Sequence, residues 1–341
     1  MKLKKLTIIF LCFSLLVFSG CTKKLEPKET ETFLMGTIVK LKVYGKNADK
    51  ALEDSVRRIS DIEKKMSTNI TSSEISTINK NAGKKFTKIS KDSFNVIKSS
   101  INYSKKTSGA FDITVEPLVK LWGIGTDKAH VPSESEIKNK VSYINYNDVI
   151  LDSKNSYVKL KNENQAIDLG GIAKGYTADE IKKVLLKNDI ESAFINLGGN
   201  LYVLGKNPEK HANWNIGIQN PLEPRGDYLG IVSTKDKSIV TSGTYERFFE
   251  KNGKRYHHIF NTKTGYPAET GLLSVSIISD KSIDGDALST SSFALGLDKG
   301  IKLIESLDNV EAIFVTKNKK VYLTSGLKDN FKLSNTSFKL N

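Results

Sequence analysis

The sequence predicts an α+β fold in which mixed sheets and packed helices form one compact unit, with room for two subdomains. Two observations lead to this expectation. Segments with helical and strand-like patterns do not alternate strictly along the chain, which argues against a doubly wound parallel sheet. The composition is that of a globular protein, with 38% hydrophobic and 26% charged residues among 341, which is enough for a sizeable core.

The first part of the chain is expected to combine a strand with several helices. Phe33–Tyr44 alternates apolar and polar residues enough to be a strand. Asn47 can cap a helix that runs to about Met66, since the residues between them place apolar side chains on one face. The further elements expected here are helices over Ser73–Asn79, from Ser90 to near Gly109 and over Gly171–Lys187, and a short buried strand at Ala193–Asn196.

The second part of the chain carries more strand-like stretches. Two helices are expected among them, over roughly Asp286–Gly296 and Lys299–Leu307. The chain shows no internal repeat and no low-complexity tract. The predicted strands are Trp214–Gln219, Tyr228–Ser233, Ser238–Thr241, Tyr256–Phe260, Leu272–Ser279, Ala312–Thr316 and Lys320–Leu323, the last two forming a hairpin around Asn318.

The N-terminus has the pattern of an exported lipoprotein. Lysines open the chain, an apolar run from Leu6 to Phe18 follows, and small residues precede Cys21. The run is short for a membrane span but suits a secretory signal, and the cysteine resembles a lipidation site. The expected division is a signal peptide over 1–20, a lipid-anchored tether over 21–32 and a folded domain over 33–341. The alternative is an uncleaved N-terminal anchor. Either way, the protein is expected on the extracytoplasmic side of the cell membrane.

Charge and cysteine content narrow the classes of function. The formal net charge is +14, but the lysines are scattered, which favours a solvated surface over a nucleic-acid groove. A mild attraction to anionic lipids would suit an anchored protein. The two cysteines, Cys12 and Cys21, both lie at the N-terminus, so the folded body has no thiol for disulfides or catalysis.

Common catalytic motifs are missing from the sequence. The four histidines, at positions 130, 211, 257 and 258, are too few and too poorly spaced for a zinc cage. No nucleophile elbow, Walker A loop or Rossmann glycine fingerprint occurs. Several widespread enzyme classes are therefore excluded.

A glycine-rich turn from Asp168 to Gly175 runs into a predicted helix. Backbone N–H groups at such a turn can approach phosphate oxygens, and Lys174 adds a positive charge. The same turn could simply allow a helix to pack closely. A second glycine pair, within Asn196–Asn200, allows the same two interpretations.

Asp286 and Thr290 stand four residues apart, which places a carboxylate and a hydroxyl on one face of a helix. Both are hard oxygen ligands of the kind that Mg²⁺ prefers. Alternatively, Asp286 near a helix N-terminus would only stabilise the helix dipole.

Two further segments carry groups suited to a ligand. Phe111 beside Asp112 could contact a heteroaromatic group, or it could be core next to a helix cap. His258 could act as a general base, because the reference pKa of histidine lies near neutrality. A lone histidine can equally be structural.

In their order and spacing, these segments together resemble the FAD:protein FMN transferase family, also named thiamine-biosynthesis lipoproteins. The resemblance covers about Phe33 to Leu323. The matching segments are Met35-Gly36-Thr37, Ser73–Ser76 with Asn79, Ser108–Asp112, Pro117 with Leu121-Trp122, Asp168–Gly175, Asn196–Gly199, Thr241–Gly243, His258-Ile259 with Thr264–Pro267, and Asp286–Thr290.

The resemblance implies Mg²⁺-dependent transfer of FMN from FAD to a threonine or serine hydroxyl of a target protein, with release of AMP. Asp286, Thr290 and a backbone carbonyl near Gly171 would hold the metal, and His258 and Asp286 would be catalytic. Expected partners are subunits of membrane redox complexes or extracytoplasmic flavoproteins, and no nucleic acid. The residues implied to line the FAD site are Met35, Ala110, Phe111, Asp112, Asp168, Lys174 and His258.

One position departs from the family pattern. Asn69 stands where the family often has tyrosine or tryptophan. An aromatic ring there could stack on FAD, whereas asparagine could admit water. This motivates an alternative in which the protein is an FAD pyrophosphatase that forms FMN and AMP. A second alternative is a flavin-binding lipoprotein without catalysis, although such a carrier needs no magnesium site.

Overall fold

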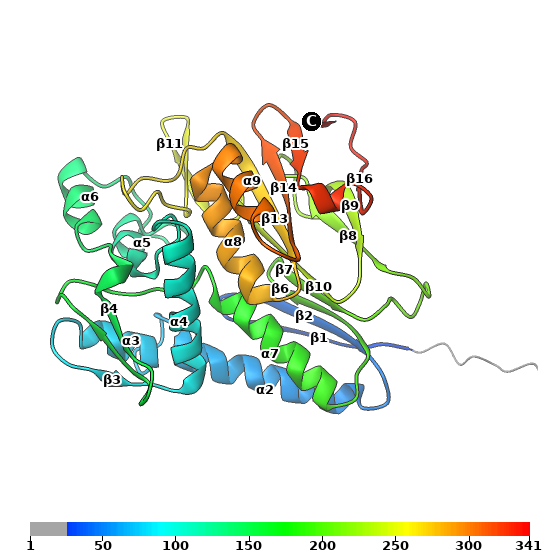
Figure 1. Ribbon diagram of the computed structural model, residues 1–341, viewed down its shortest axis with the longest axis horizontal. Coiled ribbons are helices and arrows are strands. Elements are labelled where there is room, and N and C mark those ends of the chain that lie inside the picture. The colour runs from blue at the N-terminus through cyan, green and yellow to red at the C-terminus, as the bar shows by residue number, and fades with distance from the viewer. Residues whose placement is uncertain (1–25) are drawn as a thin grey trace, which may run out of the picture.

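The computed structural model describes residues 26–341, so the predicted signal peptide, Cys21 and the first part of the tether lie outside it. Its centre is a nine-stranded sheet in the order β1-β2-β6-β7-β10-β13-β14-β15-β17 (Figure 1). Neighbouring strands are antiparallel except for the last pair, which is parallel. The strands are β1 Lys28–Leu34, β2 Thr37–Tyr44, β6 Ser192–Leu197, β7 Asn200–Leu204, β10 Lys237–Gly243, β13 Leu272–Ser279, β14 Val310–Thr316, β15 Lys320–Leu323 and β17 Lys339–Leu340.

Four helices cover one face of this sheet. α2 (Ala48–Met66) and α7 (Ala173–Lys187) pack over β2, β6 and β7, and α8 (Ser282–Leu295) and α9 (Leu297–Glu305) pack over β13 and β14. The buried side chains of α2 recur at helical spacing, which explains why this polar sequence forms a helix against the sheet.

The opposite face carries a three-stranded sheet, in the order β16-β9-β8. Apolar side chains of the two sheets, among them Trp214 and Val203, form a separate core. Its strands are β8 Trp214–Gln219, β9 Tyr228–Thr234 and β16 Phe331–Leu333, with the short helix η3 Ser325–Leu327 before the last.

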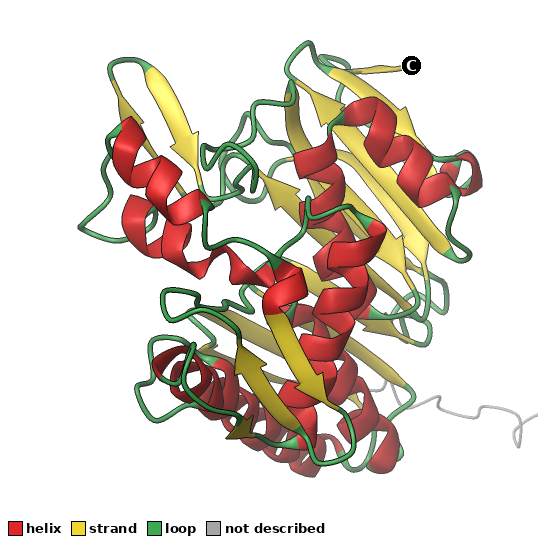
Figure 2. Cartoon of the chain, turned by 60° about the vertical axis from the view of Figure 1, so that its left-hand side comes forward, coloured by secondary structure: helices red, strands yellow, loops and turns green. Residues whose placement is uncertain are grey.

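A smaller α/β layer lies on the other side of α8 from the sheet (Figure 1). It has its own cores, and Trp122 packs against Tyr256 of a two-stranded hairpin beside α5 and α6 (Figure 2), with ring centroids 5.6 Å apart. Its elements are α3 Glu74–Lys80, β3 Thr87–Lys88, α4 Lys91–Lys106, η1 Ile113–Val115, α5 Glu116–Trp122, α6 Glu134–Val141, η2 Tyr146–Asp148, β4 Val149–Asp152, β5 Tyr157–Leu160, β11 Phe248–Lys251 and β12 Lys254–His257.

The α+β class is confirmed, and several predicted elements agree closely with the structure. β8 and β13 have the predicted bounds. Ser90 caps α4 as predicted, since its hydroxyl accepts from the Ser93 N–H. Ser73, expected within its helix, caps it instead, and the side chain of Asn47 makes no capping hydrogen bond to α2.

Other predictions were wrong. Phe33–Tyr44 is two strands, because Met35 and Gly36 both have positive φ, 54° and 67°, and turn the chain into a hairpin. Residues 28–32, assigned to the tether, belong to β1. The strand expected over Tyr256–Phe260 ends at His257. α8 begins at Ser282, a full turn before the predicted start.

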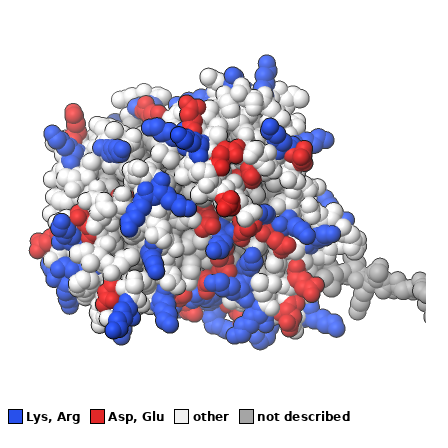
Figure 3. Space-filling view, in the orientation of Figure 1, with Lys and Arg blue, Asp and Glu red and all other residues white. Residues whose placement is uncertain are grey.

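Basic side chains are dispersed over the face shown in Figure 3 and are mixed with acidic ones. Many belong to surface ion pairs, such as that of Lys40 with Glu31 at 2.8 Å. Pairs of this kind stabilise a fold by about 1 kcal/mol or less.

Candidate functional site

The candidate site lies where the N-terminal turn of α7 meets α8. The Asp286 carboxylate of α8 accepts a hydrogen bond through Oδ2 from the Gly175 N–H, at 2.8 Å. This amide belongs to the first turn of α7 and has no partner within its own helix. A Cβ atom at Gly175 would lie 2.3 Å from the Ser282 carbonyl oxygen, so only glycine permits the contact. At Gly175, the glycine-rich segment therefore allows two helices to pack closely, as one of the two interpretations of the sequence expected.

The second helix is capped in return by the first. The Asp179 carboxylate of α7 accepts hydrogen bonds from the N–H groups of Ser282 and Ile283, at 2.7 and 3.0 Å. Burial raises the pKa of Asp179 to about 6. Each helix thus supplies a carboxylate to the N-terminus of the other, which fixes their relative position.

Oxygen atoms of three residues gather beside this crossing. Thr290 follows Asp286 by one helical turn, as predicted, and its Oγ1 lies 3.3 Å from the Ser242 hydroxyl. A Cβ at Gly171 would be 3.6 Å from the same Thr290 oxygen. Within residues 26–341, neither the Gly171 carbonyl nor Oδ1 of Asp286 takes part in a hydrogen bond.

This donor set suits a magnesium ion. It offers one carboxylate oxygen, one hydroxyl and one carbonyl, and Mg²⁺ completes such a set with water and substrate phosphates. In the described part of the chain, no group of three or more histidine, cysteine, aspartate or glutamate side chains could hold a metal. A metal here would accordingly depend on mixed oxygen ligands.

Asp168 lies in the turn before α7. Its Oδ1 accepts a hydrogen bond from the Gly170 N–H at 2.7 Å, while Lys174 donates to the Gly170 carbonyl at 3.2 Å. Burial raises the pKa of Asp168, and the Gly170 amide and the charges of Lys174 and Arg247 act in the opposite direction. The turn therefore supplies one carboxylate and one cation, and Arg247 adds a second positive charge from the loop between β10 and β11.

His258 shares this space. Its Nδ1 lies 3.2 Å from the carbonyl oxygen of Arg247, which also accepts from the His258 backbone N–H at 3.2 Å. A carbonyl oxygen only accepts, so Nδ1 carries the proton and Nε2 keeps its lone pair. Burial lowers the pKa of His258 to about 4, and the charges of Arg247 and Lys174 contribute to the lowering. At neutral pH, the ring is a neutral base.

Met35 forms the turn between β1 and β2 and links it to the helices. Its backbone N–H donates to Glu63 at 2.7 Å, and its sulfur accepts from the Thr177 hydroxyl of α7 at 3.3 Å. The next residue, Gly36, approaches the Arg247 guanidinium, since a Cβ there would lie 3.9 Å from it. The predicted residue Met35 thus belongs to the same neighbourhood as His258.

The Ala110–Asp112 segment borders the site, but the Asp112 carboxylate, which was expected to contact a ligand, binds groups of the protein itself. Phe111 is buried, and its ring lies 3.2 Å from a Cβ position at Gly171. The Asp112 carboxylate accepts from the N–H and hydroxyl of Thr114, at 2.8 and 2.7 Å, and from the Tyr146 N–H at 2.9 Å. It caps η1, so a contact of Asp112 with a ligand would have to use its backbone.

Three residues near the site escaped sequence reasoning. Arg247 is an isolated arginine in a polar loop. Thr68 lies in the turn after α2, and its side-chain hydrogen bond to Asp168 lowers the pKa of that carboxyl. Glu116 is buried at the start of α5 and pairs with Lys120 at 3.0 Å. Burial and the nearby charge of Asp168 raise the pKa of Glu116 to about 7. No sequence pattern distinguishes these residues, because their neighbours come from distant segments.

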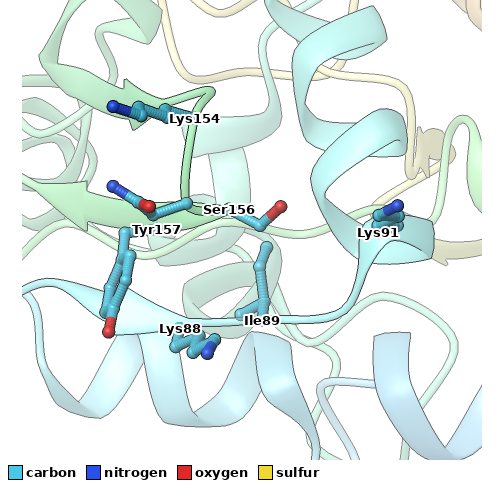
Figure 4. Close-up of a pocket in the computed structure, with 7 residues that line it drawn as sticks. Lys88, Ile89, Lys91, Lys154, Ser156 and Tyr157 are labelled. Carbon is cyan, nitrogen blue, oxygen red and sulfur yellow. The ribbon is translucent and has the colours of Figure 1, made fainter.

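A separate cavity of about 620 Å³ lies on the small sheet, away from these residues. It is lined by β3, β5 and the start of α4, and the ammonium groups of Lys88, Lys91 and Lys154 point in different directions (Figure 4). Side chains that diverge in this way do not surround one anion.

Between residues 26 and 341, no helix combines the length and the apolar character that a membrane span requires.

Comparisons with known proteins identify the family. The ApbE family model matches residues 35–314. An FAD:protein FMN transferase of Klebsiella pneumoniae is 38% identical over 293 residues, which are 86% of this chain and 90% of that protein. One from Treponema pallidum is 33% identical and covers 90% of this chain and 89% of its own length. The crystal structure of the ApbE protein of Thermotoga maritima superposes with a TM-score of 0.82, at 32% identity, over 89% of this chain and 98% of that one.

The fold and the site define an α+β protein in which the glycine-rich turn before α7 lies against the Asp286 carboxylate of α8. The chain belongs to the ApbE family, and the resemblance seen in the sequence is confirmed.

Proposed function

We propose that this protein transfers FMN from FAD to a threonine or serine hydroxyl of another protein in a Mg²⁺-dependent reaction that releases AMP. The activity named for the relatives supports this proposal. The observation that carries it in this chain is the set of Asp286, Thr290 and Gly171 oxygens beside Lys174, because displacement at a pyrophosphate requires neutralised charge.

FAD would bind with its pyrophosphate at the turn before α7. Lys174 supplies a positive charge, and the backbone from Gly170 to Gly171 allows close approach. The residues proposed to line the FAD site are Met35, Ala110, Phe111, Asp112 through its backbone, Asp168, Lys174 and His258.

Asp286, Thr290 and the Gly171 carbonyl would hold the magnesium ion. When bound, the ion neutralises the charge of the pyrophosphate and of the departing AMP. Asp286 is also held by Gly175, so its free oxygen has a fixed position.

The acceptor hydroxyl must lose its proton as its oxygen attacks the phosphorus on the FMN side. His258 is the proposed base, because its neutral Nε2 is available and its position is fixed by the Arg247 carbonyl. The bond from the phosphorus to the AMP oxygen breaks, AMP leaves with the bonding electrons, and FMN stays on the acceptor through a phosphoester. Asp286 or Asp168 could share the proton transfer.

Asn69 supports one alternative from the same site. It is exposed in the turn after α2, next to Thr68. If water took the place of the acceptor hydroxyl, the products would be free FMN and AMP. An inert flavin carrier is the other alternative, and it gives no reason for the free oxygens at Asp286 and Gly171.

We also propose that Cys21 carries a lipid that holds the enzyme on the extracytoplasmic side of the cell membrane. Such an anchor would raise the effective concentration of membrane-bound acceptors, such as subunits of redox complexes, or of other extracytoplasmic flavoproteins. Cys21→Ser should move the protein into the soluble fraction, and continued membrane association would contradict the anchor.

Product accounting tests the function. The protein from Thr22 onward, which lacks Cys21, is incubated with FAD, Mg²⁺ and a flavin-acceptor domain. AMP, free FMN and the intact mass of the acceptor are then measured. Transfer predicts one AMP for each FMN gained by the acceptor. AMP matched by free FMN, with several acceptor domains left unmodified, would favour hydrolysis. FAD that is bound and unchanged would favour the carrier.

A further inference from the structure

Within residues 26–341, Arg247 differs from the other arginines in having no acidic partner. Of the five arginines, four form ion pairs with carboxylates, including Arg225 with Glu246 at 2.7 Å and Arg255 with Glu250 at 3.0 Å. Among the residues from 26 onward, no carboxylate pairs with Arg247. It is exposed in the loop between β10 and β11.

The position of Arg247 is set by its own backbone and by two glycines. Its carbonyl receives both the backbone N–H and Nδ1 of His258. A Cβ at Gly36 would lie 3.9 Å from the guanidinium, and one at Gly125 would lie 3.4 Å from Cδ. The side chain therefore extends along two segments that have no side chains of their own at these points.

The charge of Arg247 acts on the candidate site. It lowers the pKa of both Asp168 and His258, and Lys174 does the same. Both cations therefore lie near enough to act on Asp168 and His258, and Asp168 belongs to the turn proposed to hold the pyrophosphate. Lys174 and Arg247 bring two positive charges to this site, which favours an anionic ligand such as a pyrophosphate.

We propose that Arg247 binds the pyrophosphate of FAD together with Lys174 and stabilises the charge that passes to the leaving AMP. When the acceptor oxygen bonds to the FMN phosphorus, the bond to the AMP oxygen breaks, and the AMP phosphate gains one negative charge. A guanidinium fits two phosphate oxygens at once, which an ammonium group does not. This inference rests on the proposed function for the placement of FAD.

The test compares Arg247→Gln and Arg247→Lys with Arg225→Gln, a matched control in which an exposed, paired arginine is removed. FAD and AMP affinities are measured by titration, and FMN transfer is measured in single turnovers, both over a range of salt concentrations. Arg247→Gln should weaken FAD and AMP about tenfold or more, flatten the salt dependence and slow transfer. Arg247→Lys should restore part of the affinity but less of the rate. The thermal unfolding midpoint should be unchanged, because the side chain has no partner in the fold.

The inference would be overturned if Arg247→Gln bound FAD and AMP with wild-type affinity and salt dependence and transferred FMN at the wild-type rate. Such a result would leave the transferase function intact. The inference would also be overturned by a loss of equal size in Arg225→Gln, or by a loss that follows a lower unfolding midpoint. Failure of the wild type and of Arg225→Gln to bind FAD or to transfer FMN would instead contradict the proposed function itself.

Discussion

The Asp286 carboxylate caps α7 through the Gly175 amide, 111 positions away in the sequence, at 2.8 Å. One oxygen of this side chain therefore holds two helices together, and the other, which accepts no hydrogen bond within residues 26–341, is the proposed metal ligand. A structural and a proposed chemical role meet in one residue, so variants must be chosen to separate them.

The close approach of the two helices predicts the effect of Gly175→Ala. The new methyl group would lie 2.3 Å from the Ser282 carbonyl oxygen and would push α8 from α7. We expect a loss of about 1–3 kcal/mol in the free energy of unfolding and a fall in transfer rate of about a hundredfold from displacement of Asp286. Urea unfolding and single-turnover transfer measure these effects. Gly217→Ala is the control, since the nearest atoms to its methyl group would be those of the Tyr228 side chain, at 3.2 Å. If the two variants had equal free energies of unfolding, the close packing of α7 against α8 at Gly175 would be contradicted.

Asp112→Asn separates a structural carboxylate from a ligand contact. All three donors to Asp112 come from the protein, and an amide cannot accept from all of them. The variant should lose about 1–3 kcal/mol of stability while its FAD dissociation constant changes less than twofold. Calorimetry and flavin titration check both values. A weakened FAD complex in a variant of unchanged stability would show that the carboxylate itself contacts FAD.

The lowered pKa of His258 predicts two pH effects. Because the pKa in the folded state is about 4, transfer should be constant from neutral pH down to about 5 and should fall as His258 is protonated near pH 4. The unfolded state binds protons at the ordinary pKa of about 6.5. The contribution of His258 to the free energy of unfolding should therefore decrease as the pH falls from about 6.5 to 4, whereas the raised pKa values of Glu116 and Asp179 act in the opposite direction. His258→Gln should transfer slowly at every pH and lose this contribution to stability, whereas the contribution of His257, whose pKa is also about 4, remains. If the transfer rate of His258→Gln equalled that of the wild type and fell near pH 4 in the same way, His258 would not be the base.

Asn69→Tyr tests whether this position governs water access. The residue is exposed, so a larger side chain meets no packing obstacle. A ring that stacks on FAD should tighten binding by about 1 kcal/mol, roughly fivefold, and reduce the ratio of free FMN to transferred FMN. Asn318→Tyr, at an exposed hairpin turn, is the control. Identical affinities and product ratios in both variants would remove Asn69 from the account.

Local patterns in the sequence were sufficient to predict some of the elements of this structure. β13 was predicted with its bounds because five of its eight residues are aliphatic and turns flank the segment, a pattern typical of a buried strand. The shared face of Asp286 and Thr290 follows from their spacing alone. By contrast, the hairpin at Met35 was missed, because positive φ at a non-glycine residue leaves no sequence signal.

Contacts between distant segments could not be predicted. The sequence suggested neither the Gly175 amide as the partner of Asp286 nor the approach of Arg247 to His258, since each depends on how helices and loops pack. No element was predicted between residues 112 and 170, where the strands have four residues and the helices seven or eight. Elements this short have weak periodicity, although the equally short β15 was predicted.

The most direct test of the central claim is the Mg²⁺ dependence of FMN transfer in wild type and in Asp286→Asn. Asparagine can still accept from the Gly175 amide but removes the negative charge, so α7 stays capped while the metal loses its carboxylate ligand. We predict that Mg²⁺ activates the wild type saturably and that Asp286→Asn, with an unchanged unfolding midpoint, transfers at least a hundredfold more slowly at the same Mg²⁺ concentrations. Thr290→Val should require about ten times more Mg²⁺. If folded Asp286→Asn showed the wild-type rate and Mg²⁺ dependence, the metal would not be at this crossing and the account would be wrong.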